Sequence, residues 1–212
     1  MQGKGIIFLT FLIMPVLLLA QEDRTKKKWL QPDKYLFNLY EKEKVSVSKA
    51  EFRLYRLIMD FRMSKGKDSI PLSASLTFVA QTHAGDLTEH YTPNKKCDMH
   101  SWSKKGTWTP CCYTSDHANA GCSWSKPGEL TPYKADGFEV VYFDYQIPVP
   151  GNVLEKWKKN PTNNDMLLNM GQWSTESWKA IGVGIYGNYA SVWLGKLPDK
   201  EGAPKTETKE NH

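Results

Sequence analysis

Residues 97–124, CDMHSWSKKGTWTPCCYTSDHANAGCSW, hold the side chains of this chain that are best suited to chemistry. All four cysteines lie in this segment, together with His100, His117 and three of the eight tryptophans. Histidine can act as an acid, a base or a metal ligand near neutral pH, and cysteine forms disulfides or binds metals. Frequent Gly, Pro, Ser, Thr and Asn residues interrupt any helical or strand period, so the sequence predicts a long ordered loop. Long loops in compact domains are commonly functional or covalently tied.

The first 20 residues, MQGKGIIFLTFLIMPVLLLA, predict a secretory signal peptide. One cation, Lys4, precedes an apolar run that begins at Ile6 and ends at the small residue Ala20. A membrane-spanning helix is the alternative, but it needs about 20 apolar residues, and this run is shorter and contains Pro15. We therefore expect a secreted protein, extracellular or periplasmic, with no transmembrane span after cleavage of the signal.

Export favours disulfides, because thiols outside the cytosol are oxidised. The cysteines are Cys97, Cys111, Cys112 and Cys122. A structural zinc site needs paired ligands a few residues apart, and the adjacent Cys111 and Cys112 do not fit that spacing. Four cysteines allow three pairings, and a bridge between neighbours would strain the peptide that joins them. Cys111 and Cys112 should therefore each pair with Cys97 or Cys122, in an order that the spacing leaves open.

The composition is that of a mildly basic chain. Its 28 Lys+Arg and 23 Asp+Glu residues give a formal net charge of +5. The basic residues are spread over tails and loops instead of forming a stripe with aromatic residues, which argues against nucleic acid as a partner. The length of 212 residues fits one domain. Residues 21–47 form a charged lead-in, and residues 198–212 are expected to be a solvated, disordered tail.

Two regular elements are expected to flank the cysteine loop. A helix over residues 73–89 places His83 on its apolar face, and we interpret His83 as a hydrogen-bonded structural residue, as most histidines on such faces are. Residues 138–145, FEVVYFDY, predict a strand that is covered on both faces. Glu139 lies at the start of this strand.

A hairpin is the clearest structural signal in the chain. Residues 178–196 contain two alternating runs that meet at a two-residue turn, residues 187–188. The register that follows places Val183 opposite Val192 and gathers aliphatic residues on one face. Gly184 lies on the other face, where it leaves room for another element to approach the backbone.

Further helix starts are marked by capping residues. Ser48 is followed three residues later by Glu51, which forms a capping box. After a short helix over residues 150–159, Asn160 is suited to cap the next helix, because Pro161 then takes the first helical position.

Six motifs follow one another in a fixed order within residues 48–197. They are LYRLIMDFR, IPLSASLTFVAQTHAGDL, HSWS, GFE before a strand, W-x-x-N-P-T-N-N-D-M-L-L and IGVGIYGNYASVW. This order resembles the CAP domain, the secreted family of cysteine-rich secretory proteins, antigen 5 and pathogenesis-related proteins, in its bacterial SCP-like form. The resemblance implies an α+β fold, a three-layer α-β-α sandwich with a central antiparallel sheet.

The resemblance also implies a central cleft with two histidines and two glutamates, which in some members hold a divalent metal. His100 of HSWS matches the first histidine, and Glu139 of GFE matches the first acid. Asn163 stands where the bacterial form has its second histidine, and Asn160 where other members have a serine or the second acid. Because an amide oxygen is a weak, hard ligand, we expect only weak zinc binding by His100 and Glu139. We interpret His117 as an exposed loop residue; it would add a ligand only if the loop folded over the cleft.

Two functions are compatible with this partly degraded cleft. We favour a secreted, non-catalytic binding or interaction module, whose disulfide loop and aromatic residues line a groove for a peptide, a glycan or an apolar small molecule. In this interpretation Trp102, Asn160 and Asn163 are binding residues. The alternative is a hydrolase, with or without a metal, in which His100 is the general base and Glu139 orients it or polarises water. The distance between these two side chains, and a cleft over them, would distinguish the functions.

Overall fold

The computed structural model of the protein describes residues 39–94 and 96–207. The expected signal peptide and most of the charged lead-in lie outside the described residues. The helices are α2 (Lys49–Ser64), α3 (Ala74–His90), α4 (Ala120–Trp124), α5 (Lys126–Leu130), α6 (Pro150–Lys159) and α7 (Pro161–Leu168), with 3-10 turns η1 (Lys42–Lys44) and η2 (Gly171–Trp173). The strands are β1 (Ser46–Val47), β2 (Gly137–Phe143), β3 (Ala180–Tyr186), β4 (Tyr189–Gly195) and β5 (Lys205–Thr206). Within the described ranges, no helix is both long and apolar enough to cross a membrane.

The central sheet has the strand order β2-β4-β3, and both of its strand pairs are antiparallel. Val183 lies opposite Val192 and Gly184 opposite Ser191, which confirms the predicted hairpin register. Gly187 has φ +52°, in the left-handed region that a two-residue hairpin turn requires.

The aliphatic face of the sheet packs against α2, α6 and α7. Leu54, Val153, Trp157 and Leu167 of these helices are buried in one cluster with Phe138, Val140, Val183 and Val192 of the strands. The predicted capping box at the start of α2 is present, with Ser48 and Glu51 bonded in both directions. The buried Glu51 carboxylate also accepts hydrogen bonds from Ile185 N–H (3.0 Å) and the Gln81 side chain (3.1 Å), so the cap ties α2 to β3 and to α3.

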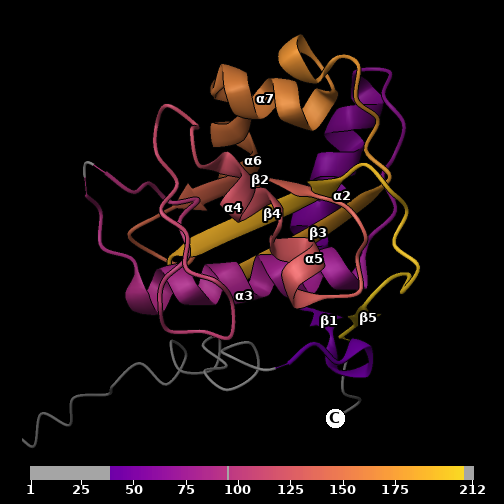
Figure 1. The fold of residues 1–212 in the computed structure, drawn as a ribbon. Helices are drawn as coiled ribbons and strands as arrows, with labels where there is room; N and C mark the ends of the chain where they lie inside the picture. Colours follow the sequence, from indigo (N-terminus) through magenta and orange to yellow (C-terminus); the bar gives the residue numbers. More distant parts are fainter. Residues whose placement is uncertain (1–38, 95, 208–212) are drawn as a thin grey trace, which may run out of the picture. The chain divides into compact units, whose positions relative to one another are not determined.

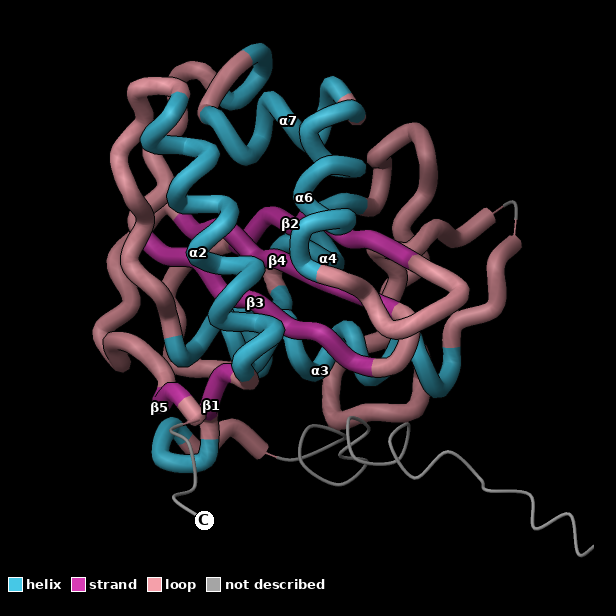
Figure 2. The backbone as a smooth tube through the Cα atoms, turned by 180° about the vertical axis from the view of Figure 1, so that it is seen from behind, coloured by secondary structure: helices cyan, strands magenta, loops and turns pink. Residues whose placement is uncertain are grey.

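The opposite face of the sheet is covered by α3 (Figure 1). A Cβ atom at Gly182 would lie 2.0 Å from the carbonyl carbon of Leu76, and one at Gly184 would lie 2.3 Å from that of Ala80. The helix backbone therefore rests directly on the glycines of β3, as the empty face of the hairpin predicted. Figure 2 shows the same arrangement from behind, with α2 and α3 on opposite sides of the strands. The predicted α+β fold, a three-layer α-β-α sandwich, is confirmed.

The segment after the sandwich corrects an expectation, because residues 198–207 are ordered. The Asp199 carboxylate accepts hydrogen bonds from the Ser73 hydroxyl (2.6 Å) and from the Ser75 N–H (2.9 Å). A carboxylate in this place stabilises the N-terminus of α3, whose first N–H groups have no partner within the helix. Farther on, β5 pairs in parallel with β1. The ordered domain therefore extends beyond residues 48–197 on both sides.

Candidate functional site

Two disulfides hold the long loop that follows α3. The first disulfide joins Cys97 to Cys112, and the second joins Cys111 to Cys122. Each of the adjacent cysteines thus pairs with an outer one, as predicted. Trp102 and Cys111 exchange two backbone hydrogen bonds of 2.8 and 3.0 Å, so the loop folds back on itself between the cysteines.

Glu139 is the centre of a buried hydrogen-bonded group. In β2 it lies opposite Trp193 of β4, and its side chain projects toward α3. Its Oε1 atom lies 2.6 Å from Nδ1 of His83 and accepts a hydrogen bond from the Ser191 hydroxyl at 2.5 Å. Its Oε2 atom lies 2.8 Å from Nδ1 of His100. The Glu139 side chain is 2% exposed, so the two histidines and the serine shield the carboxylate from water.

His83 is a member of this group that the sequence did not predict. It is fully buried on α3, its Nε2 donates to the carbonyl oxygen of Ser101 (3.0 Å), and its ring stacks on Trp102 at 4.3 Å. Both ring nitrogens therefore have partners, in agreement with a hydrogen-bonded structural histidine. Ser191 was also missed, although the hairpin register had placed it opposite Gly184, on the face that α3 covers.

His100 is the member of the group that reaches solvent. It lies in the loop, where its backbone N–H donates to the Asp98 carboxylate (2.8 Å) and its ring packs against Tyr113 at 5.1 Å. The side chain is 29% exposed. Since Nδ1 is bonded to Glu139, Nε2 is the atom of this ring that a ligand or substrate could meet.

The charges of the group stabilise one another. Burial alone would raise the pKa of Glu139, but the charge of His83 and the hydrogen bonds from His100 and His83 outweigh it and lower the pKa to about 2. For His100, burial works to lower the pKa, and the hydrogen bond and charge of Glu139, with the charge of Asp98, raise it above its ordinary value. The arrangement therefore favours an ionised carboxylate beside a charged imidazole.

These donors do not fit a zinc site. Protein zinc sites use three or four N, O or S ligands, but both oxygens of Glu139 and both nitrogens of His83 are engaged within the group. Within this group, Nε2 of His100 is the one atom left that could bind a metal ion. In the described ranges, no group of three or more His, Cys, Asp or Glu side chains is arranged to hold a metal ion. In the structure His100 and Glu139 bond to each other, and weak metal binding by these two side chains stays a prediction.

The structure joins neither Asn160 nor Asn163 to this group. The Asn160 side chain accepts the backbone N–H of Asn163 at 3.1 Å and caps α7, as predicted. Both α6 and α7 pack on the aliphatic face of the sheet, opposite to the face from which Glu139 projects. Among the described residues, no hydrogen bond or ring contact links either asparagine to His100 or Glu139. Their part in binding stays a prediction.

Trp102 is one of the residues that line the hollow described below, and its part in binding stays a prediction. It is buried, with its ring stacked on His83 and in edge contact with Trp108 at 5.1 Å, while the ammonium of Lys126 lies 5.8 Å from the ring centre. Because its flat faces are occupied within the protein, a ligand cannot stack on this indole without displacing a neighbour. The sequence offered no means to separate such packing from binding.

His117 is exposed, as interpreted from the sequence. Its backbone has φ +58°, which is uncommon outside glycine, and its ring Nδ1 lies 3.1 Å from the Tyr113 hydroxyl. Tyr113 in turn packs against His100. The loop thus places the two histidines on either side of one tyrosine.

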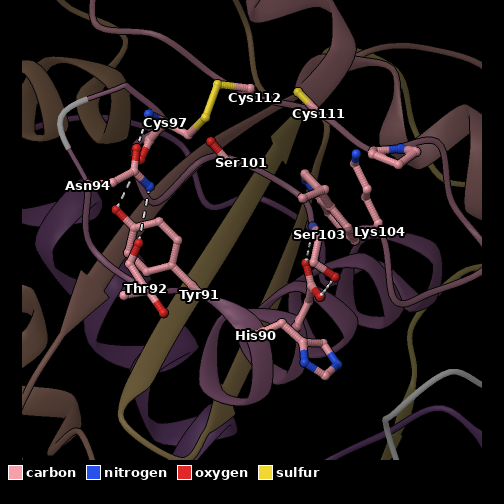
Figure 3. A pocket seen from close by; sticks show the side chains of 13 residues that line it. His90, Tyr91, Thr92, Asn94, Cys97, Ser101, Ser103, Lys104, Cys111 and Cys112 are labelled. Carbon is pink, nitrogen blue, oxygen red and sulfur yellow. Dashed lines mark hydrogen bonds between the residues drawn. A yellow bond between two sulfur atoms is a disulfide. The ribbon is translucent and has the colours of Figure 1, made fainter.

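A hollow of about 560 Å³ opens between the C-terminal end of α3 and the disulfide loop. In Figure 3, Tyr91 and Asn94 lie on one side of it and Ser103 and Lys104 on the other, below the first disulfide. The sequence predicted a groove formed by this loop, but not its position beside the end of α3.

Internal hydrogen bonds fix the walls of the hollow. The Asn94 side chain accepts the backbone N–H of Cys97 at 2.7 Å, and the Tyr91 hydroxyl donates to the carbonyl oxygen of Cys97 at 3.3 Å. On the opposite wall, the backbone N–H and the hydroxyl of Ser103 donate to the buried Asp86 carboxylate at 2.7 and 2.5 Å. Together with the disulfides, these bonds make the hollow a preformed site.

No protein-family model and no curated protein matches the chain. Among solved structures, it is similar to an outer surface protein from Borrelia burgdorferi, with 16% identity and a TM-score of 0.47 over 70% of this chain and 93% of that one. It is also similar to a cysteine-rich secretory protein from Staphylococcus aureus (17%, 0.43, covering 70% and 38%) and to an extracellular protein containing an SCP domain from Bacillus anthracis (11%, 0.48, covering 70% and 40%). The chain spans less than half the length of the last two. By name, these two belong to the family that the motif order resembles. Similarity at these identities and TM-scores does not support any conclusion about activity, ligand or partner.

Proposed function

We propose that this chain is an extracellular CAP-like protein that works as a binding or interaction module without catalysis. The observation that supports this best is the buried carboxylate of Glu139, which faces donors from His83, His100 and Ser191. A carboxylate whose oxygens are engaged by internal donors has little capacity left to polarise water or to take up a proton. The group therefore fits a structural role better than the chemistry of a hydrolase.

His100 is the remaining candidate for a general base, and its electrostatic surroundings argue against that role. Burial works to lower the pKa of His100, but its hydrogen bond to Glu139 and the nearby negative charges raise it. A raised pKa keeps more of the imidazole protonated at neutral pH, and a protonated imidazole cannot accept a proton. We infer that His100 holds the disulfide loop onto β2.

The hollow beside the first disulfide is the place where we expect the ligand. Its volume of about 560 Å³ lies within the range of roughly 300 to 1,000 Å³ that is usual for ligand pockets. Walls fixed by disulfides and internal hydrogen bonds lose little entropy when a ligand binds. A peptide end, a glycan unit or an apolar small molecule fits a site of this size.

A substitution that fills the hollow tests this proposal. Thr92 is exposed and lines the hollow, whereas Thr107 is exposed in the same loop system and does not line it. Peptide and glycan arrays and a fragment library would be screened with the wild type, Thr92→Trp, Thr107→Trp and His100→Gln. We expect Thr92→Trp to lose the ligands that Thr107→Trp retains. Turnover of any compound by the wild type that His100→Gln abolishes would overturn the non-catalytic assignment, and ligands that Thr92→Trp retains would overturn the site.

A further inference from the structure

The segment from the last residue of β2 to the residue before α6 exposes large apolar side chains in alternation. Phe143, Tyr145, Ile147 and Val149 are all exposed, and Tyr145 at the tip is 91% exposed. We refer to residues 143–149 as the apolar loop. A single exposed apolar residue needs no explanation, but four in one short segment are a candidate interaction surface.

The apolar loop is held in place by its second residue, Asp144. The Asp144 N–H donates to the carbonyl oxygen of Asn188, and the Asn188 side chain donates to the carbonyl oxygen of Asp144, both at 2.9 Å. The Tyr142 hydroxyl donates to the Asp144 carboxylate at 2.7 Å. The loop is thus fixed to the turn between β3 and β4. An apolar segment that is anchored in this way offers its side chains to a partner at a low cost in entropy.

Positive charge follows the apolar loop along α6. Lys156 and Lys159 are three residues apart in α6, so they share one helix face, and both are exposed. Val149 is the extended residue directly before the helix. The hydrogen bond from Tyr142 lowers the pKa of the Asp144 carboxyl, and the charge of Lys156 adds to the effect. Besides the pair of Lys158 with Glu155, the C-terminal half of α6 exposes two further cations, Lys156 and Lys159.

We propose that the apolar loop docks this protein onto a membrane surface that carries anionic headgroups. Tyr145 is suited to the headgroup level, because its ring is apolar and its hydroxyl is polar, and Ile147 and Val149 supply the apolar contact below it. Lys156 and Lys159 lie where they can pair with lipid phosphates, and attraction of this kind adds to the burial of apolar side chains. The inference goes beyond the proposed binding function, because it concerns a different surface.

Vesicle cosedimentation tests the apolar part of the proposal. The exported protein, with its N-terminus determined by mass spectrometry, would be mixed with phosphatidylcholine vesicles with and without phosphatidylglycerol. We expect binding that rises with the phosphatidylglycerol content and falls with salt. Ile147→Ser and Tyr145→Ser should each weaken it on the order of tenfold. Met170→Ser is the matched control, because Met170 and Ile147 are both 43% exposed, and it should bind like the wild type.

Lysine variants test the electrostatic part. Lys156→Gln and Lys159→Gln should each weaken binding to anionic vesicles by about fivefold. The double replacement of Lys158 and Glu155 by Gln is the control, since it removes two opposite charges that lie 2.6 Å apart and leaves the net charge unchanged. Circular dichroism and thermal unfolding would show that each variant is folded. The proposal would be overturned if the wild-type protein did not bind anionic vesicles. This includes the case in which the protein binds an acidic protein through Tyr145 but does not bind the vesicles. An equal loss in Met170→Ser would overturn it as well.

Discussion

Replacement of Glu139 by glutamine tests the role of the buried group. Glutamine preserves the size of the side chain but removes its charge and turns one acceptor oxygen into a donor. Nδ1 of His83 and Nδ1 of His100, at 2.6 and 2.8 Å from the carboxylate, would then lack a common counter-ion. Because the site is buried, water cannot replace the lost partner. We expect Glu139→Gln to fold, with a lower free energy of unfolding.

The size of this loss can be derived from the pKa of Glu139, which falls from 4.5 to about 2 on folding. At 1.36 kcal/mol per pKa unit, this difference corresponds to about 3 kcal/mol at neutral pH. The value agrees with the roughly 3 to 5 kcal/mol that removal of one partner from a buried ion pair costs. For a domain of this size we expect the melting temperature to fall by roughly 6 to 12 °C.

The dependence on pH gives a second readout of the same substitution. The folded pKa of Glu139 is lowered, so its contribution is present above about 4.5 and is lost as the pH falls toward 2. The folded pKa of His100 is raised, so its contribution is present below about 6.5 and is lost as the pH rises through the folded value. Wild-type stability should therefore be greatest between these limits, and Glu139→Gln should flatten both sides.

Urea unfolding from pH 3 to pH 9, with the disulfides intact, would measure both effects. Glu155→Gln is the control, because Glu155 is 57% exposed in its pair with Lys158 and should lose less than about 1 kcal/mol. The reasoning would be refuted if Glu139→Gln lost as little as Glu155→Gln, or if its stability followed pH as that of the wild type does. Either result would mean that Glu139 is not an ionised partner of the histidines.

Two further substitutions test the contacts of α3. Gly184→Ala would place a Cβ atom 2.3 Å from the carbonyl carbon of Ala80 and should lower the free energy of unfolding, measured in urea, by roughly 2 to 3 kcal/mol. Gly121→Ala is the control and should be nearly neutral, because its Cβ would meet nothing within 4 Å. Equal losses of stability in the two variants would contradict the close packing. Asp199→Ala removes a carboxylate from the start of α3 and should lower the free energy of unfolding by about 1 to 2 kcal/mol. Amide hydrogen exchange in the first turn of α3 should become faster. Unchanged exchange would mean that Ser73 caps the helix without Asp199.

Short sequence patterns correctly predicted the elements whose structure depends on neighbouring residues alone. The capping box at Ser48 needs only residues within one turn, and the hairpin about residues 187–188 follows from period-two alternation and a suitable turn. The disulfide pairing depends on how the loop folds, because the spacing allows Cys111 to reach either outer cysteine. In the structure, the backbone of Cys111 pairs with that of Trp102, and Cys112 forms its disulfide with Cys97.

Long-range contacts explain where the predictions were wrong. Residues 198–207 have the polar composition of a disordered segment, yet Asp199 bonds to α3 and β5 pairs with β1, some 160 residues away in sequence. Neither contact can be predicted from the amino-acid composition of this segment. The stacking of Trp102 on His83 is another contact that the sequence does not show, because an indole in a loop has the same sequence signature whether it packs against a histidine or against a ligand.

The pairing of His83 with Glu139 could have been inferred from the sequence. His83 was expected on the apolar face of a helix, and Glu139 in a strand covered on both faces, so each was a polar group at a buried position in need of a partner. The hairpin register left a glycine face that only a closely packed element could cover, and α3 with His83 is that element. Strand alternation then places Glu139 on the α3 side, because Phe138 belongs to the aliphatic side. With one carboxylate oxygen turned to His83, the other is free to hold His100, which fastens the disulfide loop to β2. We therefore expect the order of this loop, and of the hollow it forms, to depend on Glu139.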